Sequence, residues 1–337
     1  MLLEKLCNSI GPTGYEGDTR NLIKDELKIM NLEFSIDNMG NILVHKKGKN
    51  DKSNLKVMLS AHMDECGLII TSYNSDGTLK FSTLGSMNIN SLPCKTVLIG
   101  KHKIRGVIGL KPIHLQNKKE RTHSISLNDL CIDIGSYSKS ETKSIIDLGD
   151  FAEFNIEFEK FSDTIIKSKA LNDRLGCSIL IEMLKEDYNC DLYAAFNVQE
   201  NIGQRGVFAS NYSVKPDIFV SIDTVNANDL VDIDINEGAP VFLGRGPVIP
   251  FKAGISMLDR SNVKCIRSIA EQSDIVYQRI AGTRKEGQST SVQLTGSNMK
   301  ILSVLIPCRY MNSIVSMCDL NDYENTIKLL KKYIKSF

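Results

Sequence analysis

The stretch VMLSAHMDECGLI at residues 57–69 carries the clearest structural signal in the sequence. The apolar residues at 57–59 predict a buried strand, and the polar run AHMDE follows at 61–65, where that strand ends. In open α/β sheets, functional side chains gather at the carboxyl ends of the strands. His62 and Asp64 are therefore the first candidate site residues.

Around this stretch, strand patterns alternate with helix patterns. Short apolar runs bounded by turn residues give way to apolar residues at helical spacing, and the alternation continues from 164 to 337. This pattern predicts an α/β fold with a mixed, largely parallel sheet flanked by helices, built from residues 1–67 and 164–337. The expected strands are 42–44, 57–59, 193–198, 218–222 and 301–305, and the expected helices are 16–30, 174–187, 259–273 and 321–335.

The pattern of apolar and polar residues changes between residues 68 and 163. Apolar runs at 68–70, 97–99, 107–109 and 131–134 alternate with clusters of Gly, Asn, Ser and Lys, without helical spacing. Such a pattern is typical of a small all-β unit. We expect an inserted, barrel-like β domain at 68–163.

Composition limits the class of protein. A chain of 337 residues predicts two domains, and a formal net charge of +1 gives no electrostatic case for nucleic acid or an anionic membrane as partner. No apolar run has the length of a membrane helix and the first residues do not resemble a signal peptide, so we expect a cytoplasmic protein. The nine Cys are scattered without a C-x-x-C pair, which favours reduced thiols over disulfides or a thiolate zinc site.

Further polar clusters follow the other predicted strands or open a predicted helix. Taken singly, each has an ordinary structural explanation, such as a helix N-cap at Asn172 or a turn at Asp223. Because the fold would bring these ends to one edge of the sheet, we expect the side chains to line one cavity. Besides His62 and Asp64, the candidates are Asn172, Asp173, Arg174, Glu200, Asn201, Asp223, Arg309, Tyr310 and Asn312.

Segments spread along nearly the whole chain carry a family resemblance. They are GPTGYEG at 11–17, DNMGNILVHKKG at 37–48, VMLSAHMDECGLI at 57–69, GVIGLKPIH at 106–114, CIDIG at 131–135, KALNDRLGC at 169–177, NVQENIGQRG at 197–206, SIDT at 221–224, GRGPVI at 244–249 and IPCRYMNS at 306–313. In these segments the chain resembles the glutamyl and deblocking aminopeptidases, which use two metal ions and often form tetrahedral dodecamers. The resemblance implies a zinc-peptidase-like domain and an inserted domain that mediates dimerisation.

The resemblance also places the family's catalytic groups on positions of this sequence. In the family, two bridged metals lower the pKa of a bound water and polarise the peptide carbonyl, while a free carboxylate acts as general base. The general base falls on Glu200, and the carboxylate that orients the histidine ligand falls on Asp64. The ligands fall on His62, Asn172 and Asp223 for the first metal and on Asn172, Asn201 and Asn312 for the second.

Three of these ligand positions are asparagine. Asn172 stands where the family has the bridging aspartate, Asn201 where it has a glutamate, and Asn312 where it has a histidine. Neutral amide oxygens are poor ligands for zinc or cobalt compared with carboxylate or imidazole. The family's Gly-Thr-Asp-Ala segment is altered as well, to EGQS at 286–289. The second metal site should therefore be lost.

The first metal site keeps only His62 and Asp223, whereas catalytic zinc usually has three strong protein ligands. We expect no cofactor, or at most one weakly bound divalent ion of zinc, cobalt or manganese. A shift of the alignment by one residue would instead make Asp173 the bridging ligand. No such shift rescues position 312, because no His follows His123.

Two hypotheses from different classes remain. The leading one is a catalytically inactive homologue that binds a peptide or small peptide-like ligand and forms an oligomer through the inserted domain, alone or with an active relative. The alternative is an enzyme, either a weak single-metal aminopeptidase that uses His62, Asp223 and Glu200 or a metal-free one that uses Glu200, Asp64 and Arg174. A glycoside hydrolase is disfavoured, because the chain has no Trp for an aromatic sugar groove.

Overall fold

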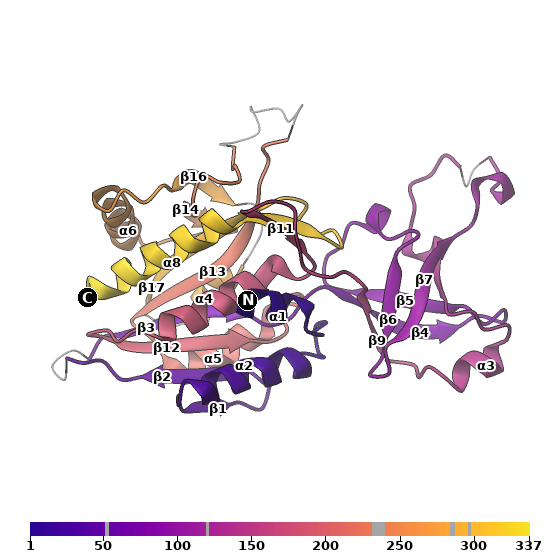
Figure 1. The fold of residues 1–337 in the computed structure, drawn as a ribbon, viewed down its shortest axis with the longest axis horizontal. Coiled ribbons are helices and arrows are strands. Elements are labelled where there is room, and N and C mark those ends of the chain that lie inside the picture. Colours follow the sequence, from indigo (N-terminus) through magenta and orange to yellow (C-terminus); the bar gives the residue numbers. More distant parts are fainter. Residues whose placement is uncertain (51–53, 119–120, 231–239, 284–286, 296–297) are drawn as a thin grey trace.

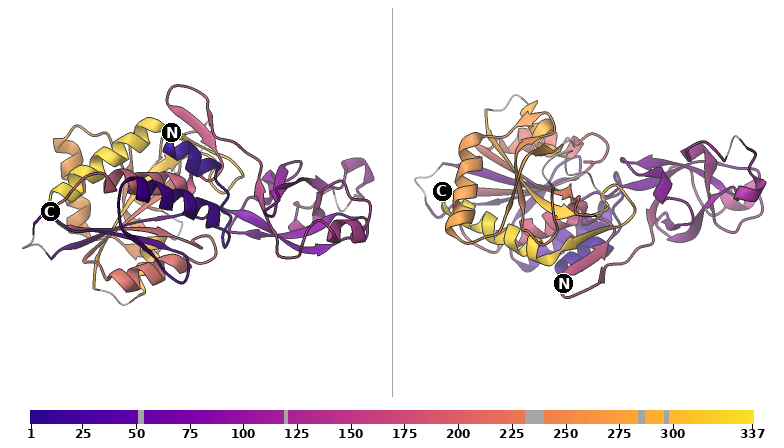
Figure 2. Two further views of the ribbon diagram at one scale, coloured as in Figure 1. Left: turned by 60° about the horizontal axis from the view of Figure 1, so that its bottom comes forward. Right: turned by 90° about the horizontal axis from the view of Figure 1, so that it is seen from above.

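The computed structural model describes residues 1–50, 54–118, 121–230, 240–283, 287–295 and 298–337. The chain forms an α/β unit and a smaller β-barrel that stands beside it (Figure 1). The two further views keep the barrel at one end of the molecule, joined to the α/β unit by two passages of the chain (Figure 2).

A nine-stranded sheet forms the centre of the α/β unit, in the order β1-β2-β12-β3-β13-β17-β14-β15, with β16 paired to β14. The four central strands, β12, β3, β13 and β17, run parallel to one another. At the two sides of this group, β2 pairs with β12 and β14 pairs with β17, both in the antiparallel sense. The strands are β1 (Phe34–Ile36), β2 (Ile42–Lys46), β3 (Lys56–His62), β12 (Asp191–Asn197), β13 (Ile218–Asn226), β14 (Val248–Ala253), β15 (Ser256–Met257), β16 (Gln278–Thr283) and β17 (Lys300–Cys308). The sheet is thus mixed, with a parallel centre and one further parallel pair, β14 with β16.

Helices cover both faces of this sheet. Helices α4, α6 and α8 pack together over one face, and α5 and α7 contact each other over the opposite face. In α6, the residues Val263, Ile266 and Ala270 are buried at helical spacing, and the side chain of Asp259 caps the first turn. The helices are α1 (Leu2–Asn8), α2 (Gly17–Ile29), α4 (Leu171–Leu184), α5 (Arg205–Val214), α6 (Arg260–Gln272), α7 (Gln288–Gln293) and α8 (Leu320–Lys335).

The inserted unit is a closed barrel in the order β4-β5-β8-β7-β6-β9. Its own core is apolar and includes Leu68, Ile70, Val97, Ile108 and Ile132. The strands are β4 (Gly67–Tyr73), β5 (Leu79–Leu84), β6 (Thr96–Ile99), β7 (Ile104–Leu110), β8 (Leu130–Asp133) and β9 (Phe151–Phe154), with α3 (Lys139–Lys143) and the short 3-10 turns Ile89–Ser91, Ile113–Leu115 and Leu127–Asp129 between them.

After the barrel, the chain returns to the α/β unit through a small sheet. Strand β10 (Glu159–Lys160) pairs with β11 (Ile165–Ser168), and β11 pairs with β18 (Ser316–Asp319). The last barrel strand ends at Phe154; Ile156 still packs against the barrel core, whereas Phe158 packs against the core of the α/β unit. None of the helices in the described ranges is long and apolar enough to cross a membrane.

Candidate functional site

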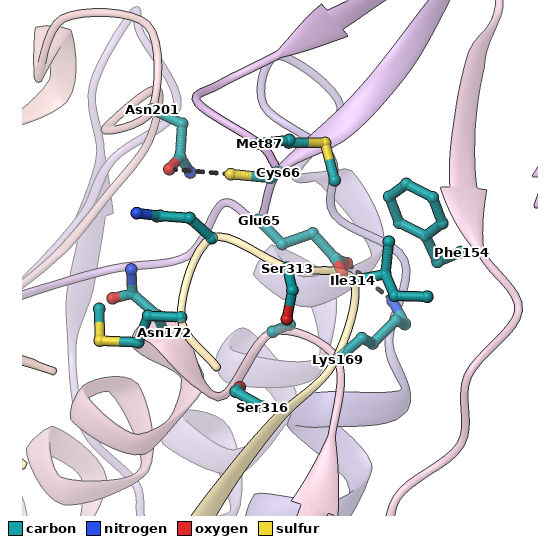
Figure 3. Close-up of a pocket in the computed structure, with 13 residues that line it drawn as sticks. Glu65, Cys66, Met87, Phe154, Lys169, Asn172, Asn201, Ser313, Ile314 and Ser316 are labelled. Carbon is teal, nitrogen blue, oxygen red and sulfur yellow. Dashed lines mark hydrogen bonds and ion pairs between the residues drawn. The ribbon is translucent and has the colours of Figure 1, made fainter. Parts of the chain in front are cut away.

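A pocket lies where the barrel meets the α/β unit, and three asparagines line it (Figure 3). Asn172 comes from the start of α4, Asn201 from the turn after β12, and Asn312 from the loop between β17 and β18. We call this cavity the carboxamide pocket. Its lining residues are Glu65, Cys66, Met87, Phe154, Lys169, Ala170, Asn172, Asn201, Met311, Asn312, Ser313, Ile314 and Ser316.

His62 and Asp64 form a fully buried pair next to the pocket. His62 ends β3, and its Nδ1 lies 3.4 Å from Asp64 Oδ1 and 3.0 Å from the Asp64 carbonyl oxygen. Burial alone would lower the pKa of His62, but Asp64, with help from Glu200 and Asp173, raises it to about 10. The imidazole is therefore held as a cation among carboxylates.

Asp64 organises the turn that follows β12. Its carboxylate accepts hydrogen bonds from the backbone N–H of Glu200 at 2.9 Å and of Asn201 at 3.1 Å, and from the Thr13 hydroxyl at 2.7 Å. Burial would raise the pKa of Asp64, but His62 and these backbone donors hold it well below its ordinary value. Glu200 itself is buried beside His62, where the resemblance puts the general base.

The orientation of the Asn201 amide follows from its neighbours. Its Nδ2 donates to Asp64 Oδ2 at 2.8 Å, and its Oδ1 accepts from the Cys66 thiol at 3.4 Å. Because the ionised Asp64 can only accept, the NH₂ side of the amide must face it. The carbonyl side then faces Cys66 and the pocket (Figure 3).

The segment 172–174 sends three consecutive side chains to three different places. Asn172 lines the pocket and is joined to Asp173 by a cis peptide bond. Asp173 is fully buried and accepts from the backbone N–H groups of His62 at 3.3 Å and Gly176 at 3.0 Å. Burial raises the pKa of Asp173 well above its ordinary value. Asn172, and not Asp173, thus faces the pocket.

Arg174 lies outside the pocket. Its guanidinium donates to the Leu6 carbonyl oxygen at 2.8 Å and to the hydroxyls of Ser9 and Thr19, and it lies 3.3 Å from Glu65 Oε1. These contacts join α4 to α1 and α2, and Arg174 is not among the residues that line the carboxamide pocket.

Asp223 sits in β13, and its carboxylate accepts from the Thr224 backbone N–H at 2.7 Å. It is buried and close enough to Asp173 to raise the pKa of that residue further. Gln288 stands at the position where the family has an aspartate. Its side-chain oxygen accepts hydrogen bonds from Ser60 and Asn197. A buried amide therefore replaces a carboxylate here as well; Glu286 in the same segment lies outside the described residues.

The loop after β17 places only one of its three candidates in the pocket. Tyr310 and Asn312 both have positive φ, and the Asn312 carbonyl oxygen accepts from the Asn88 N–H at 2.8 Å. Arg309 forms a bidentate ion pair with Asp229 at 2.7 and 2.8 Å, and the Tyr310 side chain is exposed. Asn312 lines the pocket, and neither Arg309 nor Tyr310 does.

A buried ion cluster at the junction was not predicted from the sequence. Lys169 Nζ lies 2.7 Å from both Glu65 Oε1 and Glu153 Oε2, and Arg174 lies beside Glu65. Glu65 follows β3, Glu153 belongs to barrel strand β9, and Lys169 precedes α4, so the cluster joins the two units. The only sequence signal was the charged Glu153 inside the apolar run FAEF at 151–154.

The donor set does not fit a two-metal centre. Three of the five ligand positions present neutral amides, and the Asn201 amide is turned so that its NH₂ group faces Asp64. Within the described ranges, no group of three or more His, Cys, Asp or Glu side chains is arranged so that it could hold a metal ion. The site therefore lacks the set of anionic ligands that a second metal ion needs.

Comparisons with known proteins give the family. Residues 40–329 match the family model described as M42 glutamyl aminopeptidase. The chain is 32% identical to a putative aminopeptidase of Acetivibrio thermocellus over 99% of this chain and 97% of that protein, and 30% identical to the lysyl aminopeptidase of Pyrococcus furiosus over 99% and 96%.

Comparison with solved structures points to the same family. An aminopeptidase from the archaeon Desulfurococcus kamchatkensis superimposes with a TM-score of 0.93 at 31% identity, over 100% of this chain and 94% of that one. A TET peptidase of Pyrococcus horikoshii, which assembles into a tetrahedron or a large octahedral shell, superimposes with a TM-score of 0.88 at 29% identity, over 100% and 99%. With its mixed sheet, inserted barrel and matching motifs, this chain belongs to the M42 aminopeptidase family.

Proposed function

We propose that this chain is a catalytically inactive member of the M42 family that binds a peptide or small peptide-like ligand and works as a homo-oligomer. The observation that carries the proposal is the meeting of Asn172, Asn201 and Asn312 in one pocket. These are the three positions at which the resemblance places the ligands of the second metal.

The physical reason is charge. Two dications in a buried site need several anionic ligands to offset their desolvation, and amide oxygens contribute none. Of the five ligand positions, only Asp223 carries a carboxylate. Glu200 then lacks a metal-activated water to deprotonate, because the metals normally bring the pKa of that water to near 7.

One observation favours a second candidate, a weak single-metal aminopeptidase. His62, Asp223 and Glu200 are all kept and all buried around the same site. Against it stands the number of strong ligands, which is two.

A turnover assay of the purified wild type tests the proposal. We expect little or no release of amino-terminal residues from aminoacyl substrates, with or without added zinc, cobalt or manganese. The triple variant Asn172→Asp/Asn201→Glu/Asn312→His should recover metal binding, whereas single reversions should recover little, because metal ligands act as a unit. Robust metal-dependent turnover by the wild type would refute the proposal.

The relatives and the barrel support assembly. The Pyrococcus horikoshii relative forms closed shells, and an apolar hollow on the outer wall of the barrel is lined by Thr96, Val97, Arg105, Gly106, Val107, Asp133, Ile134, Gly135 and Asn155. Val97 and Ile99 are covered by the barrel's own core, so Val107 is the residue of the predicted apolar strands that still needs cover. We place the subunit contact there, with a second copy or an active relative as partner.

The nine Cys support a reducing compartment, and we propose the cytoplasm. All nine are free thiols in the structure, and five of them are buried. The formal charge of +1 gives no reason to add nucleic acid or membrane to the partners.

A further inference from the structure

Three carboxamides from separate parts of the chain converge on the pocket, and what they can bind follows from their chemistry. Asn172, Asn201 and Asn312 each contribute a carbonyl oxygen and an NH₂ group. For Asn201 the choice between the two is fixed, since its NH₂ group is held by Asp64 and its oxygen is turned toward Cys66 on the pocket wall. At least this one contributes a hydrogen-bond acceptor to the cavity.

The surroundings of the pocket favour a positive charge. Asp64 lies 2.8 Å from the Asn201 amide, Glu200 directly precedes Asn201, and both carboxylates are buried. The neighbouring ion cluster adds nothing to this negative charge, because Lys169 and Arg174 offset Glu65 and Glu153. A buried carboxylate therefore lies directly behind the Asn201 amide, while the charged side chains of the lining itself are the paired Glu65 and Lys169.

We propose that the carboxamide pocket holds a primary ammonium group of its ligand at the place where the family holds the second metal ion. An ammonium group has three N–H donors and no acceptor, which matches three amide oxygens. It carries one charge, so neutral oxygens with carboxylates behind them can compensate its desolvation, whereas a dication needs anionic ligands in direct contact. The inference rests on the proposed function and names the ligand group that the site recognises.

The first test compares two forms of one peptide. Isothermal titration of the wild type with a trialanine amide that has a free amino terminus, and with its N-acetylated form, measures the contribution of the ammonium group. We expect the free form to bind at least about tenfold more tightly, and free alkylamines to compete with it. Equal affinities would overturn the inference and leave the inactive, peptide-binding protein standing.

Turnover in the same samples distinguishes the two proposals. Cleavage of the free peptide would refute the proposed lack of activity, whatever its affinity.

A second test measures thermal stability as well as peptide binding. In Asn312→Lys, the variant's own ammonium group lies at the pocket, so we expect a higher melting temperature than in Asn312→Met and loss of free-peptide binding. Both variants share the positive φ of residue 312, +63°, so its backbone cost cancels between them. If Asn312→Lys melts at or below the temperature of Asn312→Met, the pocket does not favour an ammonium group and the inference falls.

Discussion

At the scale of single residues, Asn201 explains why the ancestral site is hard to restore one step at a time. Its Nδ2 lies 2.8 Å from Asp64 Oδ2, and Asp64 is fully buried. A glutamate at this position would bring a second carboxylate to Asp64, and like charges in a buried site oppose ionisation. Only a cation between the two carboxylates would relieve this repulsion. Because a metal ion needs all of its ligands, Asn172, Asn201 and Asn312 should be changed together.

The His62–Asp64 pair predicts how stability depends on pH. The folded pKa of His62, about 10, lies above the ordinary value of 6.5, so the folded state binds more protons between these values. The stabilisation is therefore complete below pH 6.5 and is lost as the pH rises toward 10, with a slope of at most about 1.4 kcal/mol per pH unit. Denaturant melts of the wild type and of His62→Gln from pH 6 to 10 should show this slope only in the wild type.

The exposed His45 provides the matched control for that experiment. It stacks on Tyr193 and lies 3.3 Å from Asp191, with 45% of its side chain exposed. His45→Gln should keep the pH dependence of the wild type. A slope that survives in His62→Gln would show that another group titrates.

Residue types and motifs located the strand and helix ends that carry the candidate side chains, but not the direction in which each side chain points. The ends of β3, β12 and β13 could be located because apolar runs stop there, and Asn172, Asn201 and Asn312 do line one pocket. Arg174, Arg309 and Tyr310 sit in the same motifs yet point elsewhere, because partners distant in sequence, such as Thr19 and Asp229, hold the two arginines. Such contacts leave no local pattern in a sequence.

At the scale of elements, the central strands and long helices were predictable and the edges of the sheet were not. The apolar runs of β3, β13 and β17 are buried on both faces and mark themselves in the sequence, and the amphipathic spacing of α6 and α8 does the same. Helix α1 and strand β15 are too short for a periodic signal. The antiparallel sense of β2 and β14 depends on chain connections that no local pattern encodes.

The junction ion cluster gives a prediction at this scale. Lys169→Met should lower the free energy of unfolding by roughly 3–5 kcal/mol, because it leaves Glu65 and Glu153 buried without their shared cation. Lys167→Met is the matched control two residues earlier, since Lys167 pairs with the exposed Glu159 at 2.8 Å and such pairs contribute roughly 0–1 kcal/mol. Urea melts of both variants measure the difference, and equal losses would contradict a special role for Lys169.

At the scale of the whole molecule, the barrel stands apart from the α/β unit and presents its outer wall to other molecules (Figure 1). The side chains of β7 alternate, so that Ile108 enters the barrel core while Val107 is 45% exposed at the apolar hollow. Exposed apolar surface around a concave site is typical of protein interfaces.

Substitution of Val107 tests this assembly. Val107→Asp should place a charge in the contact and shift the sedimentation coefficient of the protein to that of a smaller species, with unchanged circular dichroism. Tyr137→Asp is the control on the same barrel, because Tyr137 is 90% exposed and does not line the hollow. The wild type should sediment as a dimer or a larger assembly at micromolar concentration. A monomeric wild type would refute the oligomer itself. An aspartate buried in an apolar interface costs several kcal/mol. An intact assembly in Val107→Asp would therefore show that the subunits make contact through another surface.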